Sequence, residues 1–266
     1  MAKKKIAIIG GGNMGTAIAT GLLKSGFSRP EDLILTKRRV QTLQYLTDQG
    51  VTVQTDNHQA VAGADVVIMA IKPYNIKPVL KSLVEDLNPR KQILISIVTG
   101  AWLKDLEAIL GPDFPIFRAM PNTAIAIQES MTCLCHKNAT EQQASWVHDL
   151  FHQLGTSIEI DENLMDAATV LGACGIAYAL RFIRANIQGG IEIGFDSRTA
   201  NLIAAQTVKG AAELLIREKK HPEEEIDKVT TPKGCTIAGL NEMEHQGFSS
   251  SLIKGVTASY NKIIKG

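Results

Sequence analysis

The residues best suited to chemistry begin near the amino terminus, where glycines have the spacing of a dinucleotide-binding loop. Gly10, Gly12 and Gly15 follow the apolar run from Ile6 to Ile9 and open an amphipathic helical pattern. In such a loop the first glycine makes a tight turn, the second lets the backbone approach a pyrophosphate, and the third lets the helix pack on the strand. The segment therefore predicts cofactor contacts from Ile9, Gly10, Gly11, Gly12, Asn13, Met14 and Gly15.

The end of the next apolar run indicates which dinucleotide binds. An acidic residue there would bind the ribose 2′-hydroxyl of NAD, but this chain has Thr36, Lys37, Arg38 and Arg39. Cationic side chains suit a 2′-phosphate. We therefore expect NADP(H), held in part by Thr36, Lys37 and Arg38. The alternatives are use of NAD(H) as well, and a basic helix start that is merely solvated.

A second polar segment, in the carboxyl-terminal half, combines hydroxyls, proline and glycine ahead of a helical pattern. Free N–H groups of Gly234, Cys235 and Thr236 at a helix start would bind a carboxylate, and the Thr236 hydroxyl would hydrogen-bond a second group. The alternative is an ordinary capped helix start, with Thr231 as the cap and Pro232 as the first helical residue.

Short β-branched runs must position the glycine loop. Several are apolar throughout, as strands buried on both faces of a parallel sheet should be. They alternate with helical patterns to about residue 160, which predicts an α/β fold with a Rossmann-type, doubly wound parallel sheet. The expected strands are Ile6 to Ile9, Leu33 to Thr36, Val51 to Val53, Asp65 to Ile71, Gln92 to Val98, Ile116 to Arg118 and Met131 to Cys135.

The remainder of the chain is predicted to be helical. Long stretches rich in Ala, Leu and Ile run from Asn163 to Gly190 and from Ser197 to Lys219. Asp196 or the serine after it can cap the second stretch, Pro222 can open a further helix, and Gly247 can close one. The helices carry apolar residues on more than one face, so we expect an all-α dimerisation and substrate domain over residues 161–266, after a dinucleotide domain over residues 1–160, in an obligate homodimer.

Composition narrows the class of ligand. Of the 266 residues, 45% are hydrophobic and 21% charged, and the formal net charge is +1. This charge gives no argument for nucleic acid or an acidic membrane as a partner, and no stretch is expected to reach the roughly 20 apolar residues of a membrane span. The four cysteines form no CxxC pair, which in a reducing compartment fits buried, small hydrophobic side chains with a structural role rather than disulfides or a metal site. We expect a cytoplasmic protein with a small-molecule ligand and no metal.

Two histidines superficially resemble a zinc motif. His148 and His152 stand four residues apart on a predicted helix. The apolar stripe of that helix contains Val147, Leu150 and Phe151, so both histidines fall on or beside its polar face. We expect a solvated pair.

Together these segments resemble pyrroline-5-carboxylate reductase, the last enzyme of proline biosynthesis, over nearly the whole chain. The resemblance is specific because it rests on several separated motifs. These are Gly10 to Gly15, Ala70 to Pro73, Ser96 to Gly100, Arg118 to Thr123, Asp166 to Thr169 and, above all, Thr230 to Leu240.

The resemblance implies an NADPH-dependent oxidoreductase with a helical domain that interlocks with a partner's, active sites between the domains, and in some members a ring of dimers. The implied reaction is hydride transfer to C5 of 1-pyrroline-5-carboxylate, giving L-proline, with Thr236 as the catalytic residue that hydrogen-bonds the imine nitrogen. By position, it implies cofactor contacts from Asn57, Ala70, Ile71, Lys72, Pro73, Ile97, Val98 and Thr99, and substrate contacts from Glu162, Gly234, Cys235 and Thr236.

Three departures from the family pattern bear on substrate preference. Lys233 stands where the family usually has glycine, so the backbone there must accept a side chain. The run from Gly172 to Ile176 replaces a serine- and glycine-rich run ending in proline, and Ala124 replaces a common proline. A six-membered or sulfur-containing cyclic imine carboxylate is therefore the alternative substrate. A non-catalytic nucleotide sensor on the same fold is a third hypothesis.

Overall fold

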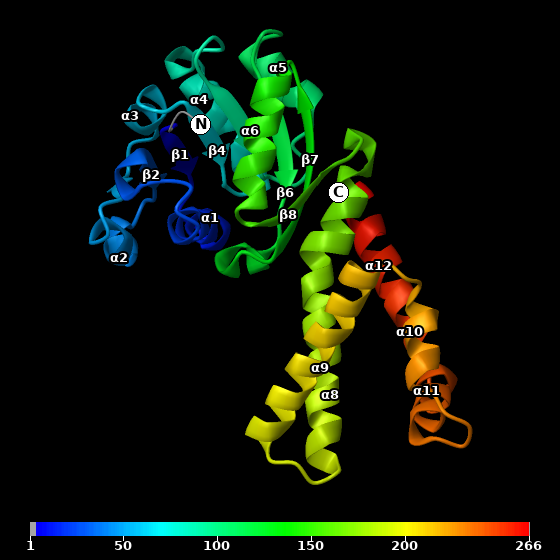
Figure 1. Ribbon diagram of the computed structural model, residues 1–266. Helices are drawn as coiled ribbons and strands as arrows, with labels where there is room; N and C mark the ends of the chain where they lie inside the picture. The colour runs from blue at the N-terminus through cyan, green and yellow to red at the C-terminus, as the bar shows by residue number, and fades with distance from the viewer. Residues whose placement is uncertain (1–3, 266) are drawn as a thin grey trace. The chain divides into compact units, whose positions relative to one another are not determined.

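The computed structural model describes residues 4–265, which divide into two compact units (Figure 1). One unit comprises the chain up to Cys174 together with the last residues from Ile263 onward. The other runs from Gly175 to Lys262. The domain border expected after residue 160 stays a prediction, because a division by compactness does not test where a folding domain begins.

The first unit is built on an eight-stranded sheet in the order β3-β2-β1-β4-β5-β6-β7-β8. Strands β1 to β6 are parallel to one another, β7 is antiparallel to β6, and β8 is parallel to β7. The predicted doubly wound α/β sheet is confirmed, although its last two strands, β7 and β8, run opposite to the other six. The strands are β1 (Ile6–Ile9), β2 (Leu33–Thr36), β3 (Thr52–Gln54), β4 (Val66–Met69), β5 (Ile93–Ser96), β6 (Ile116–Met120), β7 (Ser130–Lys137) and β8 (Gly155–Glu159).

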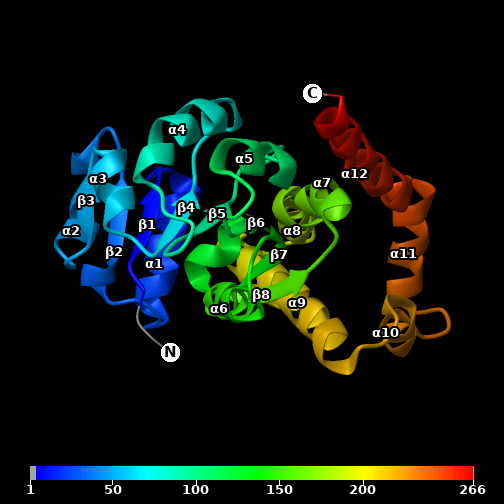
Figure 2. The same ribbon diagram turned by 90° about the horizontal axis from the view of Figure 1, so that it is seen from above.

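Helices cover both faces of this sheet (Figure 2). In β1, Ile6 and Ile8 pack into a core with α1 and α6, whereas Ala7 and Ile9 pack into a second core with α3, α4 and α5. Burial on both faces explains why the two strands at the middle of the sheet, β1 and β4, are apolar at every position. The helices of this unit are α1 (Asn13–Lys24), α2 (Gln44–Thr47), α3 (Asn57–Ala62), α4 (Ile76–Leu83), α5 (Leu103–Leu110), α6 (Glu141–His152) and α7 (Met165–Ala168).

Strand β8 was not predicted, because its sequence is polar and its side chains are half-exposed or exposed. Gly155 begins the strand with φ +138°, and a Cβ atom there would lie 2.1 Å from the Ser130 carbonyl oxygen. Glycine therefore allows β8 to start directly beside β7. A local pattern search for apolar runs misses such an edge strand.

Short 3-10 helices and one π-helix join these elements. The 3-10 helices span Pro30–Asp32, Val40–Leu43, Pro73–Asn75, Val84–Asp86, Thr123–Ile127 and Glu162–Leu164, and the π-helix spans Thr169–Cys174.

The second unit is helical, as predicted. Asp196 caps α9 by accepting hydrogen bonds from the N–H groups of Arg198 and Thr199 at 3.0 and 3.1 Å. Pro222 is the first residue of α10, and Gly247, with φ +79°, separates α11 from α12. The helices are α8 (Gly175–Glu192), α9 (Ser197–Glu218), α10 (Pro222–Val229), α11 (Cys235–His245) and α12 (Phe248–Ile264).

Most apolar side chains of these helices have no cover within the single chain. Ala200 is buried on α9, and a Cβ atom on Gly190 of α8 would lie 3.2 Å from its methyl group. In contrast, Leu202 and Ile216 on α9 are 69% and 68% exposed. Large apolar side chains exposed along a helix mark an interaction surface.

The helical run Glu162–Glu192 is long and apolar enough to cross a membrane by length and composition, with 17% of its most apolar 18-residue window buried. The expectation that no stretch reaches a membrane span was therefore wrong for this run. The error arose because Ala, Gly and scattered Leu and Ile residues give a high mean hydropathy without a continuous run of apolar residues. A helix that pairs with a second copy of the chain has the same composition, so composition alone does not separate the two.

Candidate cofactor and substrate sites

The glycine loop has the geometry that its three predicted roles require. Gly10 has φ +113°, and a Cβ atom there would lie 2.5 Å from the Ala70 carbonyl oxygen. A Cβ atom on Gly15 would lie 2.1 Å from the Gly10 carbonyl oxygen, so the absence of a side chain lets α1 pack against β1. At Gly12 a Cβ atom would meet nothing within 4 Å, which leaves this backbone open to a ligand.

The loop lies at the switch point of the sheet. Strands β1 and β4 are neighbours, yet α1 after β1 and α4 after β4 pack into different cores on opposite faces. A crevice at the carboxyl ends of such strands is where dinucleotides bind. Helix α1 begins after Gly12 without a side-chain cap or an acidic residue in its first turn, so the N–H groups of Asn13 and Met14 have no internal competitor for an anion. Ile9 is buried and can contribute only its backbone.

The basic run after β2 adjoins the glycine loop. Thr36 is buried, and its Oγ1 accepts a hydrogen bond from the Gly10 N–H at 3.2 Å, while its carbonyl oxygen accepts one from the Gly11 N–H at 2.6 Å. Thr36 therefore braces the loop. A Cβ atom on Gly11 would lie 3.2 Å from the Lys37 Cβ, which places Lys37 against the loop. Among residues 4–265, neither Lys37 nor Arg38 forms an ion pair, so both are available for a phosphate.

The other predicted cofactor contacts follow the carboxyl ends of β3, β4 and β5, and thus share one edge of the sheet. Asn57 is the first residue of α3, which Asp56 caps. The Ala70 N–H donates to the Ile9 carbonyl oxygen, and the Ile97 N–H donates to that of Met69. Ile71, Ile97 and Thr99 are half-buried, whereas Lys72 and Pro73 are exposed.

Val98 is the exception in this set. Its side chain is 3% exposed and packs in the core beside α4 and α5. Only its backbone is left for a cofactor contact. A position next to the site in sequence is not enough to place a side chain in it.

The second polar segment forms a turn followed by α11. The predicted free N–H of Gly234 is wrong, because this group donates to the Thr231 carbonyl oxygen at 2.9 Å and closes the turn. A Cβ atom on Gly234 would lie 2.5 Å from the Thr231 Oγ1, so a side chain there would have to displace this hydroxyl. Gly234 is the N-cap of α11 and no side chain caps the helix, which leaves the N–H groups of Cys235 and Thr236 in its open first turn. The alternative start, with Thr231 as the cap, is not observed.

Lys233 adopts a left-handed conformation, with φ +61°. This is the region that favours glycine, so the departure from the family pattern places a side chain where the backbone disfavours one. With Pro232 before it and the Thr231–Gly234 hydrogen bond across it, the segment has the features of a type II turn. The Lys233 side chain is exposed.

Glu162 is already engaged in the first unit. Its Oε1 accepts hydrogen bonds from the Leu103 N–H at 2.6 Å and from the Arg118 guanidinium at 2.8 Å. Sequence reasoning did not single out Arg118 as a site residue, although it was quoted within a motif. The available signal was a charged residue inside the apolar strand β6, because a buried charge requires a partner.

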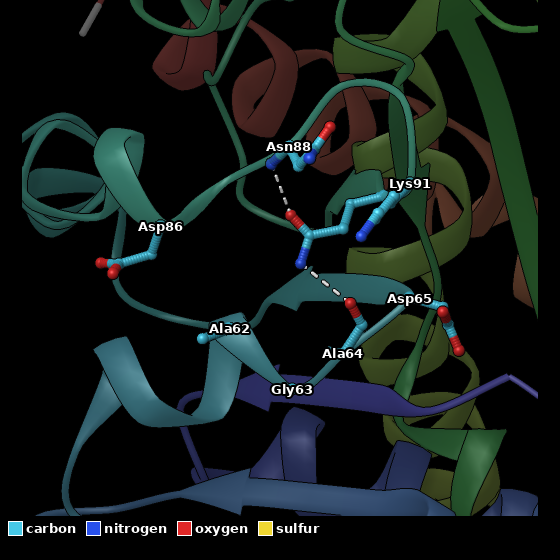
Figure 3. Close-up of a pocket in the computed structure, with 8 residues that line it drawn as sticks. Ala62, Gly63, Ala64, Asp65, Asp86, Asn88 and Lys91 are labelled. Atoms are coloured by element: carbon cyan, nitrogen blue, oxygen red, sulfur yellow. Dashed lines mark hydrogen bonds between the residues drawn. The ribbon is translucent and has the colours of Figure 1, made fainter.

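Other candidate clusters do not form a site. The hollow drawn in Figure 3 lies beside residues that precede β4 and β5, at the amino-terminal ends of these strands. The glycine loop lies at the opposite, carboxyl-terminal ends of the strands. The buried amide of the hollow is already hydrogen-bonded: Gln92 donates to the Val61 and Ala64 carbonyl oxygens, each at 2.8 Å, and accepts from the Asn88 N–H at 2.7 Å. Asp86 pairs with His58.

The two histidines that superficially resemble a zinc motif, His148 and His152, do not have the surroundings of a metal site. His152 is exposed as predicted, but His148 is half-buried, and its Nε2 lies 3.6 Å from Glu159. The predicted solvated pair is therefore wrong for His148. No metal-binding group of three or more His, Cys, Asp or Glu residues occurs in the part of the chain that the structure describes.

Two of the four cysteine thiols, those of Cys133 and Cys135, have a pKa shifted by burial. Burial raises the pKa of Cys135 to about 12 and also raises the pKa of Cys133. Neither is a thiolate near neutral pH. All four cysteines are free, but the expectation of buried thiols is wrong for Cys235, which is exposed, and Cys174 is only half-buried.

An open glycine loop at the switch point of a parallel sheet, with unpaired cations beside it, defines a nicotinamide-dinucleotide oxidoreductase. The family described as "NADP oxidoreductase coenzyme F420-dependent" matches residues 5–100, and "Pyrroline-5-carboxylate reductase dimerisation" matches residues 162–265. Pyrroline-5-carboxylate reductase 2 of Dictyostelium discoideum is 40% identical over 98% of this chain and 93% of its own. The chain belongs to the pyrroline-5-carboxylate reductase family.

Further relatives agree. Pyrroline-5-carboxylate reductase of Methanosarcina acetivorans is 34% identical over 96% of this chain and 95% of its own. Pyrroline-5-carboxylate reductase 1 of Dictyostelium discoideum is 46% identical over 97% of this chain, but the match spans 49% of that longer protein. Pyrroline carboxylate reductase of Plasmodium falciparum, solved with NADP bound, superposes with a TM-score of 0.90 at 27% identity, covering 99% of this chain and 98% of that one.

Proposed function

We propose that this protein reduces 1-pyrroline-5-carboxylate to L-proline with NADPH. The observation that carries the proposal is the match to proteins named for this activity over both compact units, at 40% identity across 98% of the chain. Their names give no support to a six-membered or sulfur-containing ring. The intact glycine loop and the open start of α11 argue against a sensor that has lost catalysis.

The residues present fit NADPH. The space above Gly12, which a Cβ would fill, admits a pyrophosphate, and the uncapped start of α1 offers it N–H groups. Lys37 and Arg38 would bind the 2′-phosphate, with NAD(H) as the weaker cofactor because it lacks this group. We propose that the nicotinamide and its ribose contact Asn57, Ala70, Ile71, Lys72, Pro73, Ile97, Val98 and Thr99. Val98 would contribute only its backbone, because its side chain is buried.

The bound cofactor supplies a hydride to C5 of the imine. The carbon–nitrogen π bond breaks, its electron pair moves to nitrogen, and a protonated iminium thereby becomes the secondary amine of proline. We propose that the Thr236 hydroxyl, which has no hydrogen-bond partner among residues 4–265, hydrogen-bonds this nitrogen and holds the ring for attack. The N–H groups of Cys235 and Thr236 would bind the carboxylate, and the second carboxylate oxygen of Glu162 would contact the substrate.

The test is NADPH oxidation by the purified protein with 1-pyrroline-5-carboxylate, followed by detection of proline. Thr236→Val should lower kcat by about 10- to 100-fold, the equivalent of one oriented hydrogen bond, without changing NADPH affinity. Thr257→Val is the matched control, because the Thr257 hydroxyl donates to the Ile253 carbonyl oxygen within α12. A wild-type protein that binds NADPH but does not oxidise it would overturn the proposed function. A fully active Thr236→Val would overturn only the role of Thr236.

We propose that the assembly is a homodimer in the cytoplasm. The dimerisation match covers the helices whose apolar faces are exposed, which supports a second copy of the chain as their cover. Free cysteines throughout fit a reducing compartment. Sedimentation analysis would measure the dimer and any ring of dimers, and a monomer at micromolar concentration would contradict the proposal.

A further inference from the structure

Arg118 forms a buried junction in the first unit. Its side chain is 2% exposed, and its guanidinium bonds to the Glu162 Oε1 at 2.8 Å. The same guanidinium lies over the Trp102 ring, 5.2 Å from the ring centroid. Glu162 in turn accepts the Leu103 N–H at 2.6 Å, in the first turn of α5. One cation therefore joins β6, the start of α5 and the start of the helical run at Glu162.

These contacts hold the loop between β5 and α5 from both ends. At the beginning of the loop, Ser96 ends β5 and pairs in register with Arg118 through the backbone. At the other end, Trp102 and Leu103 are held by the Arg118 guanidinium, directly and through Glu162. The enclosed residues include Ile97, Val98 and Thr99, which we propose to contact the nicotinamide and ribose. A shift of Arg118 would therefore move both ends of a cofactor-contacting loop.

The junction is not arranged for stability alone. The Arg118 NH2 group is buried without a hydrogen-bond partner in the described part of the chain, and so is the Asp166 Oδ1. A buried donor without a partner is costly, and an apolar side chain of similar volume would avoid the cost of burying a charge. A simple packing role therefore does not explain the guanidinium at this position.

We propose that Arg118 is a positioning residue for hydride transfer, acting through the loop from Ile97 to Trp102. The inference rests on the proposed function, since it assumes that this loop orients the nicotinamide against the imine. Arg118 does not touch the reacting atoms. Its charge and its planar fork fix Trp102 and Glu162, and these fix the loop. Misplacement of a reacting group by about 1 Å can lower a rate by about 100-fold.

The test compares Arg118→Met, Arg118→Lys and Lys137→Met in the full-length protein. Arg118→Met keeps a long side chain over Trp102 without charge, and Arg118→Lys keeps the charge without the fork. Lys137→Met is the matched control, because it removes the Lys137–Glu107 ion pair, 2.6 Å long, which also joins α5 to the sheet. We expect Arg118→Met to lower kcat by about 10- to 100-fold at saturating NADPH and imine. Arg118→Lys should restore part of it, and Lys137→Met should keep wild-type kcat.

The outcomes separate this inference from the proposed function. If the wild type is active and folded Arg118→Met keeps kcat within about twofold of it, the positioning role is refuted while the reductase activity stands. An equal loss of kcat in Lys137→Met would also refute it, because any loosening of α5 would then suffice. If Arg118→Met does not fold, Trp102→Ala removes only the ring face of the junction and should lower kcat with unchanged imine KM. Wild-type kcat in that variant would refute the inference.

Discussion

Alanine at Gly12 and at Gly15 should separate cofactor binding from folding within one loop. At Gly15 the new Cβ would lie 2.1 Å from the Gly10 carbonyl oxygen and 3.1 Å from the Ile8 side chain. Such overpacking costs about 1–3 kcal/mol. For a unit of this size each kcal/mol lowers Tm by about 2–4 °C, so we expect Gly15→Ala to melt about 2–12 °C below the wild type. Its NADPH affinity should fall as well, because α1 must move away from β1.

At Gly12 the same methyl group meets no protein atom within 4 Å, and φ −80° suits alanine. Folding should therefore change little, with Tm within about 4 °C of the wild type, since replacing glycine by alanine at an N-cap changes stability by about 1 kcal/mol or less. The methyl group would occupy the space assigned to the pyrophosphate. We expect the NADPH Kd to rise by about 10- to 100-fold, equivalent to about 1.4–2.8 kcal/mol.

Circular dichroism melts and titration of NADPH fluorescence measure the two effects on the same samples. Wild-type NADPH affinity in Gly12→Ala would refute the placement of the pyrophosphate over this glycine. A Gly15→Ala protein with wild-type Tm would refute the reasoning from close packing.

Three further predictions concern charge and thiols. Arg38→Ala should raise the NADPH KM by about 10-fold and leave the NADH KM unchanged, because a charged hydrogen bond to the 2′-phosphate is worth about 1.5–3 kcal/mol. An equal change in KM for both cofactors would contradict the assignment of Arg38 to the 2′-phosphate. In folded protein at pH 8, Cys133 and Cys135 should resist a thiol reagent that modifies them after unfolding, because burial raises the pKa of both; mass mapping of the labelled cysteines checks this. A hydrogen bond from Lys137, first of all, lowers the pKa of Glu107 below its ordinary 4.5, so the stabilisation it gives is present above that value and is lost as pH falls through the lowered pKa. The Tm difference between wild type and Lys137→Met should accordingly be positive at pH 7 and shrink as the pH falls below 4.5, which melting curves recorded over a series of acidic pH values measure.

The sheet could be predicted where burial on both faces gives a strand a continuous run of apolar residues. Strand β1 is apolar at every position because its two faces contact different cores, and so is β4, whereas β2 and β5 are apolar up to a polar last residue. Strand β8 has no such signal, because it lies at the edge and pairs on one side only. Its existence depends on Gly155 lying against Ser130, a contact that no local pattern contains. The antiparallel direction of β7 likewise depends on the path of the chain between β6 and β7, which no local residue pattern specifies.

The sites show the same division between local and distant information. The glycine loop was predictable because its three roles belong to residues within one turn of chain, from Gly10 to Gly15. The start of α11 was predicted in part: the helix is open as expected, but the hydrogen bond between Gly234 and Thr231 depends on the left-handed backbone of Lys233 in the turn between them. The contact of Arg118 with Glu162, 44 residues away, could not be deduced from spacing.

The exposed helices show how structure resolves what composition leaves open. The run Glu162–Glu192 passes a length and hydropathy test for a membrane span. Yet Arg181 and Arg184 are exposed on α8, and an arginine at the centre of a bilayer costs about 2.5–3.5 kcal/mol or more. The same helix also has a polar contact, since the Tyr178 hydroxyl lies 2.5 Å from the Ser259 hydroxyl on α12. A protein interface accepts apolar side chains at its centre and arginines at its rim. The charge pattern of α8 therefore favours a second copy of the chain over lipid as the cover for its apolar face.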